Sequence, residues 1–149
     1  MQARDACRKM PVTVTADATV ADAAEAMDSQ AVGAVVVVNG GRPIGIVTDR
    51  DLALRVLARR LPLDSRVDDV MSTAIVTLGA TADVREAVRI FSEHAFRRLP
   101  LVEEGRMVGM LTVDDLLMNV VSDLGNLVRP ITGEVIFGHP EPTTPAERL

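Results

Sequence analysis

The sequence predicts an α/β (α+β) protein in which two tandem β-α-β-β-α units pack sheet to sheet about a pseudo-two-fold axis. The first observation is an internal repeat, since GIVTDRDL at residues 45–52 returns as GMLTVDDL at residues 109–116. The second is that both copies carry the same order of β-branched runs and helical apolar patterns. The third is a glycine-bearing turn in each copy, which is typical of a β-hairpin. The same offset of 64 residues pairs Thr13 with Thr77, Val20 with Val84, Ala31 with Ala95, Gly41 with Gly105 and Arg42 with Arg106.

Each copy opens with a short β-branched strand, at residues 12–14 and 75–77, and a helix follows it. Thr19 and Asp83 stand where the N-caps of these helices belong. The apolar residues at helical spacing are Val20, Ala23, Ala24 and Met27 in the first copy and Val84, Ala87, Val88 and Phe91 in the second. The hairpin strands are predicted at residues 34–38 and 43–47 and at residues 99–102 and 107–111. A second capped helix follows each hairpin.

The repeat also predicts the domain organisation. The three parts are the first repeat with an N-terminal helix and a linker (1–66), the second repeat (67–127) and a partly disordered tail (128–149). Short helical turns are expected at residues 3–10 and 67–71, and the helical pattern stops after about Asn126, where prolines accumulate. One half-covered three-stranded sheet is marginal alone, so the two sheets are expected to bury one another and to leave two equivalent clefts.

The composition excludes several classes of protein. A formal net charge of −5 argues against sequence-independent nucleic-acid binding, which needs a basic face. The one cysteine, Cys7, cannot form an internal disulfide and fits a reducing compartment. The first residues lack the apolar stretch of a signal peptide, and no apolar run is long enough to span a bilayer. We therefore expect a cytoplasmic protein with no nucleic-acid or membrane partner.

The motif with the clearest chemistry is Gly-x-x-Thr-x-x-Asp, which occurs once in each copy. Its threonine, Thr48 or Thr112, stands where a strand ends and a helix begins, so unpaired backbone N–H groups lie nearby. Its aspartate, Asp51 or Asp115, follows one turn later, and a carboxylate accepts hydrogen bonds from the two hydroxyls of a ribose. The pattern fits a sugar and a phosphate at a helix N-terminus. It also fits a plain capping box, and for each copy that alternative stays open.

The order of elements and three phrases of sequence resemble tandem CBS domains, the cystathionine β-synthase type that pairs into a Bateman module. The phrases are VGAVVVV, GIVTDRDL and FRRLPLV, and the resemblance extends from about Arg8 to Leu124. It implies a stand-alone bacterial module that binds AMP, ADP, ATP, S-adenosylmethionine or a related adenosine compound as a regulatory ligand. No cofactor is implied beyond that ligand.

The resemblance further implies two ligand clefts. Asp51 and Asp115 match the aspartates that hold the ribose, and Thr48 and Thr112 match hydroxyls that face the sugar or the phosphate. The other residues expected at the Asp51 cleft are Ile46, Val76, Phe96, Arg97 and Arg98. The other residues expected at the Asp115 cleft are Val12, Val32, Gly33 and Met110.

The two clefts differ at three repeat-related positions. The differing pairs are Arg97 against Gly33, Arg98 against Ala34 and Pro100 against Val36. The arginines either approach the phosphates of a ligand, so that the Asp51 cleft prefers more phosphate, or they are solvated side chains at a sheet edge. Copy two has the proline that is usual in the family and copy one does not, so the resemblance leaves open how tightly the Asp115 cleft is shaped.

The sequence shows no catalytic or metal-binding constellation. His94 and His139 are the only histidines, and neither stands at zinc-site spacing with Cys7. The acids at the helix starts are explained by the helix dipole, and no nucleophile–base set or phosphate-binding glycine loop is found. We therefore expect no catalytic residue, no metal and no enzymatic activity.

Three functions compete on this sequence. In the first, an adenosine nucleotide binds a cleft, alters the packing of the two copies and so allosterically modulates an unknown effector protein. In the second, the repeat is a ligand-free dimeric scaffold. A small nucleotide-processing enzyme is the weakest of the three. A homodimer is expected through apolar helix faces carrying Leu52, Val56 and Leu57 and Leu116, Leu117 and Val120.

Overall fold

The computed structural model describes residues 1–8 and 10–137, with side chains described as far as residue 129. These residues belong to two compact units, Met1–Asp115 and Leu116–Leu149. All strands of the described residues, and every predicted site residue, lie in the first unit. Residues 138–149, which make up most of the predicted tail, lie outside the described residues.

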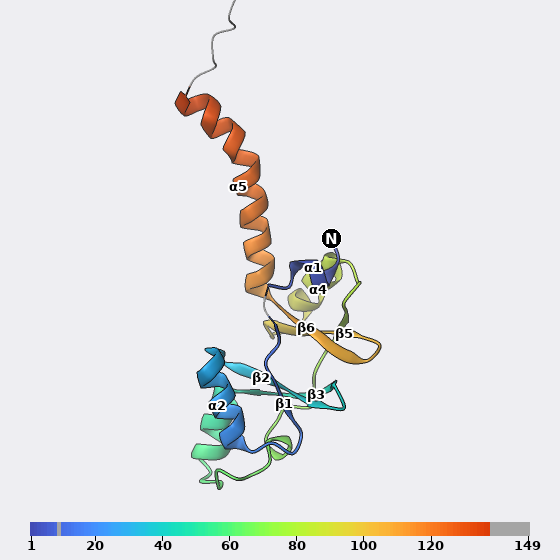
Figure 1. Ribbon diagram of the computed structural model, residues 1–149, viewed down its shortest axis with the longest axis vertical. Coiled ribbons are helices and arrows are strands. Elements are labelled where there is room, and N and C mark those ends of the chain that lie inside the picture. Colours follow the sequence, from blue (N-terminus) through green and yellow to red (C-terminus); the bar gives the residue numbers. More distant parts are fainter. Residues whose placement is uncertain (9, 138–149) are drawn as a thin grey trace, which may run out of the picture. The chain divides into compact units, whose positions relative to one another are not determined.

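The first copy is a three-stranded sheet in the order β1-β2-β3 with helical segments packed on it (Figure 1). Its elements are β1 (Thr13–Thr15), α2 (Val20–Gln30), β2 (Ala34–Asn39), β3 (Arg42–Thr48), α3 (Asp49–Asp51) and the π-helical turn η1 (Leu52–Leu57). β1 runs parallel to β2, and β2 forms an antiparallel hairpin with β3. Met27 and Val56 from the helical segments pack with Val35 in the core of this copy.

The second copy repeats this arrangement with the sheet order β4-β5-β6. Its elements are β4 (Leu78–Gly79), α4 (Val84–Glu93), β5 (Arg98–Glu103), β6 (Arg106–Thr112) and the start of α5 (Val113–Phe137). β4 and β5 are parallel, and β5 and β6 are antiparallel, with the same irregularity of register as in the first hairpin. The predicted α/β fold of two tandem β-α-β-β-α units is confirmed.

The helices begin at the residues that the sequence predicts. The Thr19 side chain accepts a hydrogen bond from the Asp22 backbone N–H at 3.0 Å, and α2 starts at the next residue. The Asp83 carboxylate accepts from the Arg85 backbone N–H at 2.8 Å at the start of α4. Both predicted N-caps are confirmed, because each side chain satisfies a backbone donor that the helix leaves unpaired.

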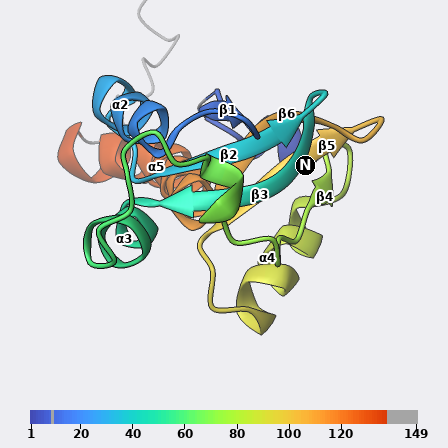
Figure 2. The ribbon, with the colours of Figure 1, turned by 90° about the horizontal axis from the view of Figure 1, so that it is seen from below.

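The two sheets face each other inside the first unit. The middle strands are buried on both faces, as Val35, Val36 and Val37 show in β2 and as Leu99, Pro100 and Leu101 show in β5. A strand buried on both faces needs a layer on each side, here the helices and the other sheet. β3 contacts β6, and Figure 2 shows the two hairpins one over the other.

Contacts between the hairpin turns are reciprocal, as a pseudo-two-fold axis requires. A Cβ built on Gly41 would lie 3.6 Å from the Arg106 side chain, and one built on Gly105 would lie 3.5 Å from the Arg42 side chain. The Met107 N–H also donates to the Gly41 carbonyl oxygen at 2.9 Å. Glycine at these two turns, both with positive φ, lets the arginine of the opposite copy approach.

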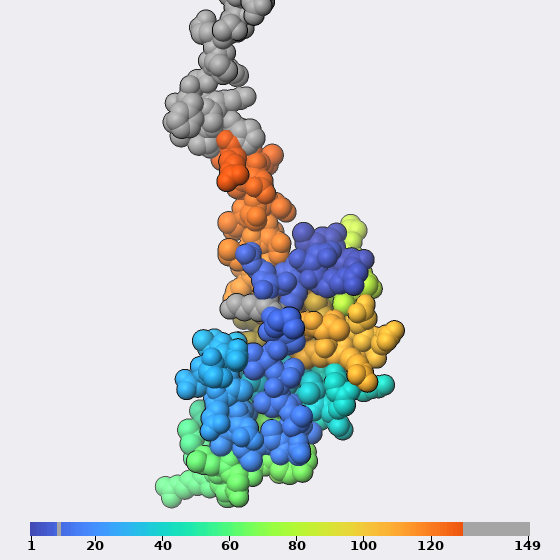
Figure 3. Space-filling view, viewed as in Figure 1, coloured from blue at the N-terminus to red at the C-terminus, as the bar shows by residue number. Residues whose placement is uncertain are grey.

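Each copy is completed by the segment that precedes the other copy along the chain. The turn η2 (Val67–Asp69) packs on the first copy, where the Val67 N–H donates to the Ala18 carbonyl oxygen at 2.8 Å. The helix α1 (Ala3–Ala6) packs on the second copy, where the Ala3 N–H donates to the Ala82 carbonyl oxygen at 2.8 Å. Figure 3 shows this N-terminal segment, in dark blue, against the orange and yellow-green of the second copy. α1 and η2 therefore each pack on the copy that does not directly follow them in the sequence.

Three sequence predictions differ from the structure. The strand predicted at residues 75–77 is wrong, because β4 is Leu78–Gly79. The helical turns expected at residues 3–10 and 67–71 are shorter, and are limited to α1 and η2. The loss of helical pattern after Asn126 is also wrong: α5 continues to Phe137, since apolar residues keep helical spacing past Gly125.

Of the apolar residues predicted for a dimer face, one is buried within the first copy and three are more than half exposed. Val56 is only 3% exposed and belongs to the core of the first copy, so it is not available to a partner. Leu57 is 68% exposed. In the second unit Leu117 is 56% exposed and Val120 is 55% exposed.

Candidate functional site

A pocket of about 360 Å³ lies in the first unit beside the start of α3. It is lined by Ile46, Thr48, Asp51, Ser72, Ala74, Ile75, Val76, Ala95, Phe96, Arg97 and Arg98. This set contains all seven residues that the sequence predicts for the Asp51 cleft. They come from β3, the α3 start, the segment before β4 and the start of β5, so the fold brings together parts of both copies. We call this cavity the Asp51 pocket.

Thr48 and Asp51 form a reciprocal capping box at the edge of the pocket. The Thr48 backbone N–H donates to Asp51 Oδ2 at 2.9 Å, and the Asp51 backbone N–H donates to Thr48 Oγ1 at 3.1 Å. The other carboxylate oxygen, Asp51 Oδ1, lies 3.8 Å from Arg55 Nε, whose guanidinium is also held by the Val70 carbonyl oxygen at 2.8 Å. The capping alternative raised by the sequence is thus real. Because a carboxylate has about four acceptor sites, the cap leaves capacity for a further donor.

One wall of the pocket is fixed by a backbone bridge between the copies' connecting segment and β3. The Ile46 N–H donates to the Ser72 carbonyl oxygen at 3.0 Å, and the Ser72 N–H donates back to the Ile46 carbonyl oxygen at 2.9 Å. Gly45 allows this approach, since a Cβ there would lie 3.0 Å from the Ser72 carbonyl oxygen and 2.8 Å from Met71 Cγ. Gly45 is the first residue of the motif identified in the sequence, but the sequence alone does not show this close packing.

The segment before β4 lines the pocket because Pro100 prevents it from pairing. In the first copy the Val36 N–H donates to the Val12 carbonyl oxygen at 3.0 Å, and the parallel ladder begins at Thr13. Pro100 stands at the position of Val36 and has no N–H, so the equivalent bond to Val76 cannot form. The ladder therefore begins later, at Leu78, and the preceding residues remain at the pocket wall. This explains the wrong strand prediction at residues 75–77.

Four lining residues were not predicted from the sequence: Ser72, Ala74, Ile75 and Ala95. Ser72, Ala74 and Ile75 lie in the connecting segment that Pro100 leaves unpaired. The proline was the available signal, because it predicts a gap in the strand ladder. Ala95 is the repeat partner of Ala31 and directly precedes Phe96.

The positive charge of the pocket comes from two arginines, one directly before β5 and one at its first position. Arg97 donates to Asp114 Oδ1 at 3.4 Å, and its own carbonyl oxygen accepts from the Val113 N–H at 3.1 Å. Arg98 Nη2 would lie 3.7 Å from a Cβ on Gly33, beside Asp49. Both arginines thus line the pocket, and the guanidinium of each lies near an acidic residue at the start of a helix.

The residues predicted for the Asp115 cleft have different surroundings. Thr112 and Asp115 repeat the capping box, with bonds of 3.0 Å and 3.1 Å, and Asp115 is buried. Val12 packs against the core of the first copy, and Gly33 lies against Asp49 and Arg98 instead. Met110 accepts a hydrogen bond from the Cys7 thiol at its carbonyl oxygen, at 3.1 Å. Val32 lies at the end of α2, where its N–H donates to the Met27 carbonyl oxygen at 3.0 Å.

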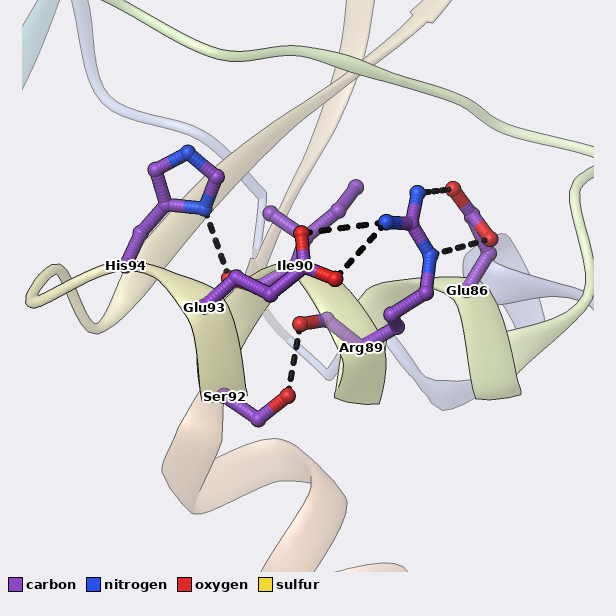
Figure 4. Close-up of polar contacts among 6 residues, drawn as sticks. All are labelled: Glu86, Arg89, Ile90, Ser92, Glu93 and His94. Carbon is purple, nitrogen blue, oxygen red and sulfur yellow. Dashed lines mark hydrogen bonds and ion pairs between the residues drawn. The ribbon is translucent and has the colours of Figure 1, made fainter.

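His94 is the C-cap residue of α4 (Figure 4). Its Nδ1 lies 2.9 Å from the Ile90 carbonyl oxygen, and its ring centroid lies 5.0 Å from that of Phe96. On the same helix Arg89 bonds Glu86 and Glu93, which lowers the pKa of Glu86 and raises that of Arg89. These contacts explain the polar face of α4 as helix-stabilising ion pairs. His139 lies outside the described residues.

The described residues include neither a metal-binding cluster nor a membrane-spanning helix. No group of three or more His, Cys, Asp and Glu side chains in this part of the chain is placed to hold a metal ion. None of the described helices combines the length and the apolar character needed to cross a membrane.

Comparison with known proteins gives the family. A family model for the CBS domain matches residues 3–58 and again residues 67–122. CBS domain-containing protein YhcV of Bacillus subtilis is 34% identical over 120 residues, which cover 80% of this chain and 86% of that protein. Among solved structures, Hypoxic Response Protein I with two coordinated zinc ions is 28% identical, with a TM-score of 0.72 over 79% of this chain and 98% of that chain.

A second solved structure carries a nucleotide. CBS domain protein PAE2072 from Pyrobaculum aerophilum, complexed with AMP, is 28% identical, with a TM-score of 0.69 over 78% of this chain and 90% of that chain. The two matched segments coincide with the two β-α-β-β-α units seen in the structure. The chain belongs to the CBS-domain family and holds two CBS domains in tandem.

Proposed function

We propose that this chain is a regulatory module that binds an adenosine nucleotide in the Asp51 pocket and modulates a partner rather than catalysing a reaction. The observation that carries the proposal is the composition of that pocket. Asp51 and Thr48 at a helix start, an apolar wall and two arginines all line one cavity of about 360 Å³. Cavities that take small ligands are typically about 300–1,000 Å³ and combine apolar walls with few polar groups.

The polar groups suit the parts of a nucleotide. The Asp51 carboxylate has acceptor sites for the two hydroxyls of a ribose. Arg97 and Arg98 offer planar donor sets for phosphate oxygens. Ile46, Ile75 and Val76 offer aliphatic surface for an adenine ring. PAE2072, a family member of 28% identity, is complexed with AMP, which supports the same class of ligand here. AMP, ADP and ATP are the first candidates and S-adenosylmethionine is the next.

The test is thermal unfolding with AMP, ADP, ATP, S-adenosylmethionine and NAD. A ligand at 100 times its Kd adds about 2.7 kcal/mol to the free energy of unfolding, so the melting temperature should rise by several degrees. Asp51→Asn keeps an acceptor for the Thr48 N–H but loses the charge, and we expect it to abolish the shift. Asp22→Ala removes the same kind of capping box at α2, away from the pocket, and should lower stability without changing the shift.

Two outcomes would contradict the proposal. If none of the five compounds raises the melting temperature of the wild type, the ligand-free scaffold replaces the sensor. If the chain converts a bound nucleotide to product in a turnover assay, the protein is an enzyme.

The scaffold has one observation in its favour, the exposed apolar residues of the helices. Leu117, Val120 and Leu124 on α5 are each more than half exposed. We extend the proposal to self-association through these residues, which would link ligand occupancy to assembly. Sedimentation of the wild type and of Leu117→Asp with Val120→Asp tests this, and an unchanged monomer in both would contradict it. The effector and a cytoplasmic location remain predictions.

A further inference from the structure

Arg97 lines the Asp51 pocket and has an ionic partner, Asp114, that does not line it. Its Nη2 donates to Asp114 Oδ1 at 3.4 Å, and Arg97 is also one of the residues that line the Asp51 pocket. The two side chains are 66% and 81% exposed. The Arg97 carbonyl oxygen is held separately by the Val113 N–H at 3.1 Å, so the backbone of Arg97 stays in place whatever its guanidinium binds.

The helix cap does not account for Asp114. The cap at the start of α5 is made by Thr112 and Asp115, with bonds of 3.0 Å and 3.1 Å. In the first copy the residues at the positions of Asp114 and Arg97 are Arg50 and Gly33, so this ion pair has no counterpart there. The acid and the arginine thus both belong to the second copy, and the first copy has neither.

The pair is weak enough to be replaced. An exposed ion pair contributes little to stability, because water screens it and ordering two long side chains costs entropy. A phosphate group offers an arginine more charge and a matched pair of acceptor oxygens. A phosphate in the pocket would therefore replace Asp114 as the partner of Arg97. Breaking the ion pair costs a small free energy, which lowers the affinity for a phosphorylated ligand but not for a ligand without phosphate.

We propose that Asp114 is a specificity-determining residue that competes with ligand phosphate for Arg97 and so limits how strongly the Asp51 pocket prefers phosphorylated ligands. This rests on the proposed function, because it requires a nucleotide in that pocket. Asp114 does not contact the ligand itself. It acts through the position and charge of Arg97, and adenosine, which has no phosphate, does not respond to it.

The test is calorimetric titration of adenosine, AMP and ATP into the wild type and into Asp114→Asn. Breaking an exposed pair changes the competition by a factor of about two to five, so ATP and AMP should bind that much more tightly to Asp114→Asn. Adenosine affinity should be unchanged. Asp64→Asn makes the same charge change at an exposed residue outside the pocket lining and controls for general electrostatics.

A double-mutant cycle separates the ion pair from the net charge. In the Arg97→Ala background, Asp114→Asn should give no gain beyond that of Asp64→Asn. The inference is overturned if wild type binds ATP but Asp114→Asn gains no more than Asp64→Asn, or if the gain survives without Arg97. If wild type binds none of the three compounds, the proposed function itself fails and the inference fails with it.

Discussion

The regions around Asp51 and around Asp115, here called the Asp51 side and the Asp115 side of the first unit, contain the same motif but have different surroundings. Both end a strand in threonine, both close a capping box with aspartate, and the bond lengths agree to within 0.1 Å. Yet the Asp51 side opens into a pocket lined by two arginines, whereas Asp115 is buried. The same cap therefore has different surroundings in the two copies, and residues outside the motif account for the lining of the Asp51 pocket.

Those residues lie in the other copy. Arg97 directly precedes β5, and Arg98 and Pro100 belong to it. The two arginines line the pocket together with the cap residues Thr48 and Asp51. The arginines supply charge, and the proline leaves the segment before β4 unpaired so that it becomes a wall. The site thus depends on both copies being folded against each other, which is the property that a ligand-controlled regulatory module needs.

The largest effect is expected from removing the charge that distinguishes the two sides. Arg97→Ala should weaken ATP and ADP by about ten-fold or more, because a hydrogen bond to a charged group contributes about 1.5–3 kcal/mol. Adenosine should change little. Calorimetric titration of the three compounds measures both quantities. Equal losses for all three would mean that Arg97 does not face the phosphates.

The next test compares the glycines that begin the two motifs. Gly45→Ala places a Cβ 2.8 Å from Met71 Cγ and 3.0 Å from the Ser72 carbonyl oxygen, so the pocket wall must move. We expect a loss of about 1–3 kcal/mol in the free energy of unfolding. Gly109→Ala meets Cys7 Sγ at 3.2 Å, a longer contact with a side chain rather than with backbone, and should cost less than Gly45→Ala. Denaturant unfolding of both variants gives the comparison, which fails if Gly109→Ala is the more damaging.

Pro100 in β5 and Val36 in β2 occupy equivalent positions of the two copies, and exchanging the residue types tests the role of the proline. Pro100→Val restores an N–H opposite Val76, so β4 should lengthen and draw that residue from the pocket wall. ATP affinity should fall roughly five-fold if one hydrogen bond of about 1 kcal/mol favours the paired state. Val36→Pro removes the bond to the Val12 carbonyl oxygen in a central strand and should destabilise the protein. Unchanged ATP binding in Pro100→Val would refute the explanation of the open wall.

The smallest effect concerns the caps of α2 and α4, which are Thr19 and Asp83 at equivalent positions. The Arg85 side chain and then its backbone N–H hold the pKa of Asp83 at about 2, below its usual 3.8. A depressed pKa gives stability that is present above pH 3.8 and lost as pH falls toward 2. Asp83→Asn should keep the cap and flatten the fall in melting temperature over that range. An identical fall in both proteins would show that the cap does not titrate.

Much of the fold and one of the two candidate sites followed from the sequence because the repeat constrains both. The offset that aligns Thr48 with Thr112 also predicts which segments face each cap, and seven lining residues of the Asp51 pocket are found together. The wall at Ser72, Ala74 and Ile75 was missed because it depends on a bond that Pro100 cannot make. Strand propensity alone cannot show that this segment is unpaired, because its residues are of types that also occur in strands.

The packing of the preceding segments was also beyond the sequence. α1 and η2 are each a single short turn, and the copy on which each packs is decided by long-range backbone bonds such as those of Ala3 and Val67. The buried state of Val56 was missed for a related reason. A helical apolar residue is equally compatible with the core and with an interface until the neighbouring sheet is known.

The central claim is that one side of the repeat is the ligand site, and calorimetric titration of ATP into Asp51→Asn and Asp115→Asn tests it most directly. Both variants lose one carboxylate charge and keep an acceptor for the cap. The account predicts that the tight site of the wild type is lost in Asp51→Asn and retained in Asp115→Asn. Retention of that site in Asp51→Asn, or its loss in Asp115→Asn, would contradict it.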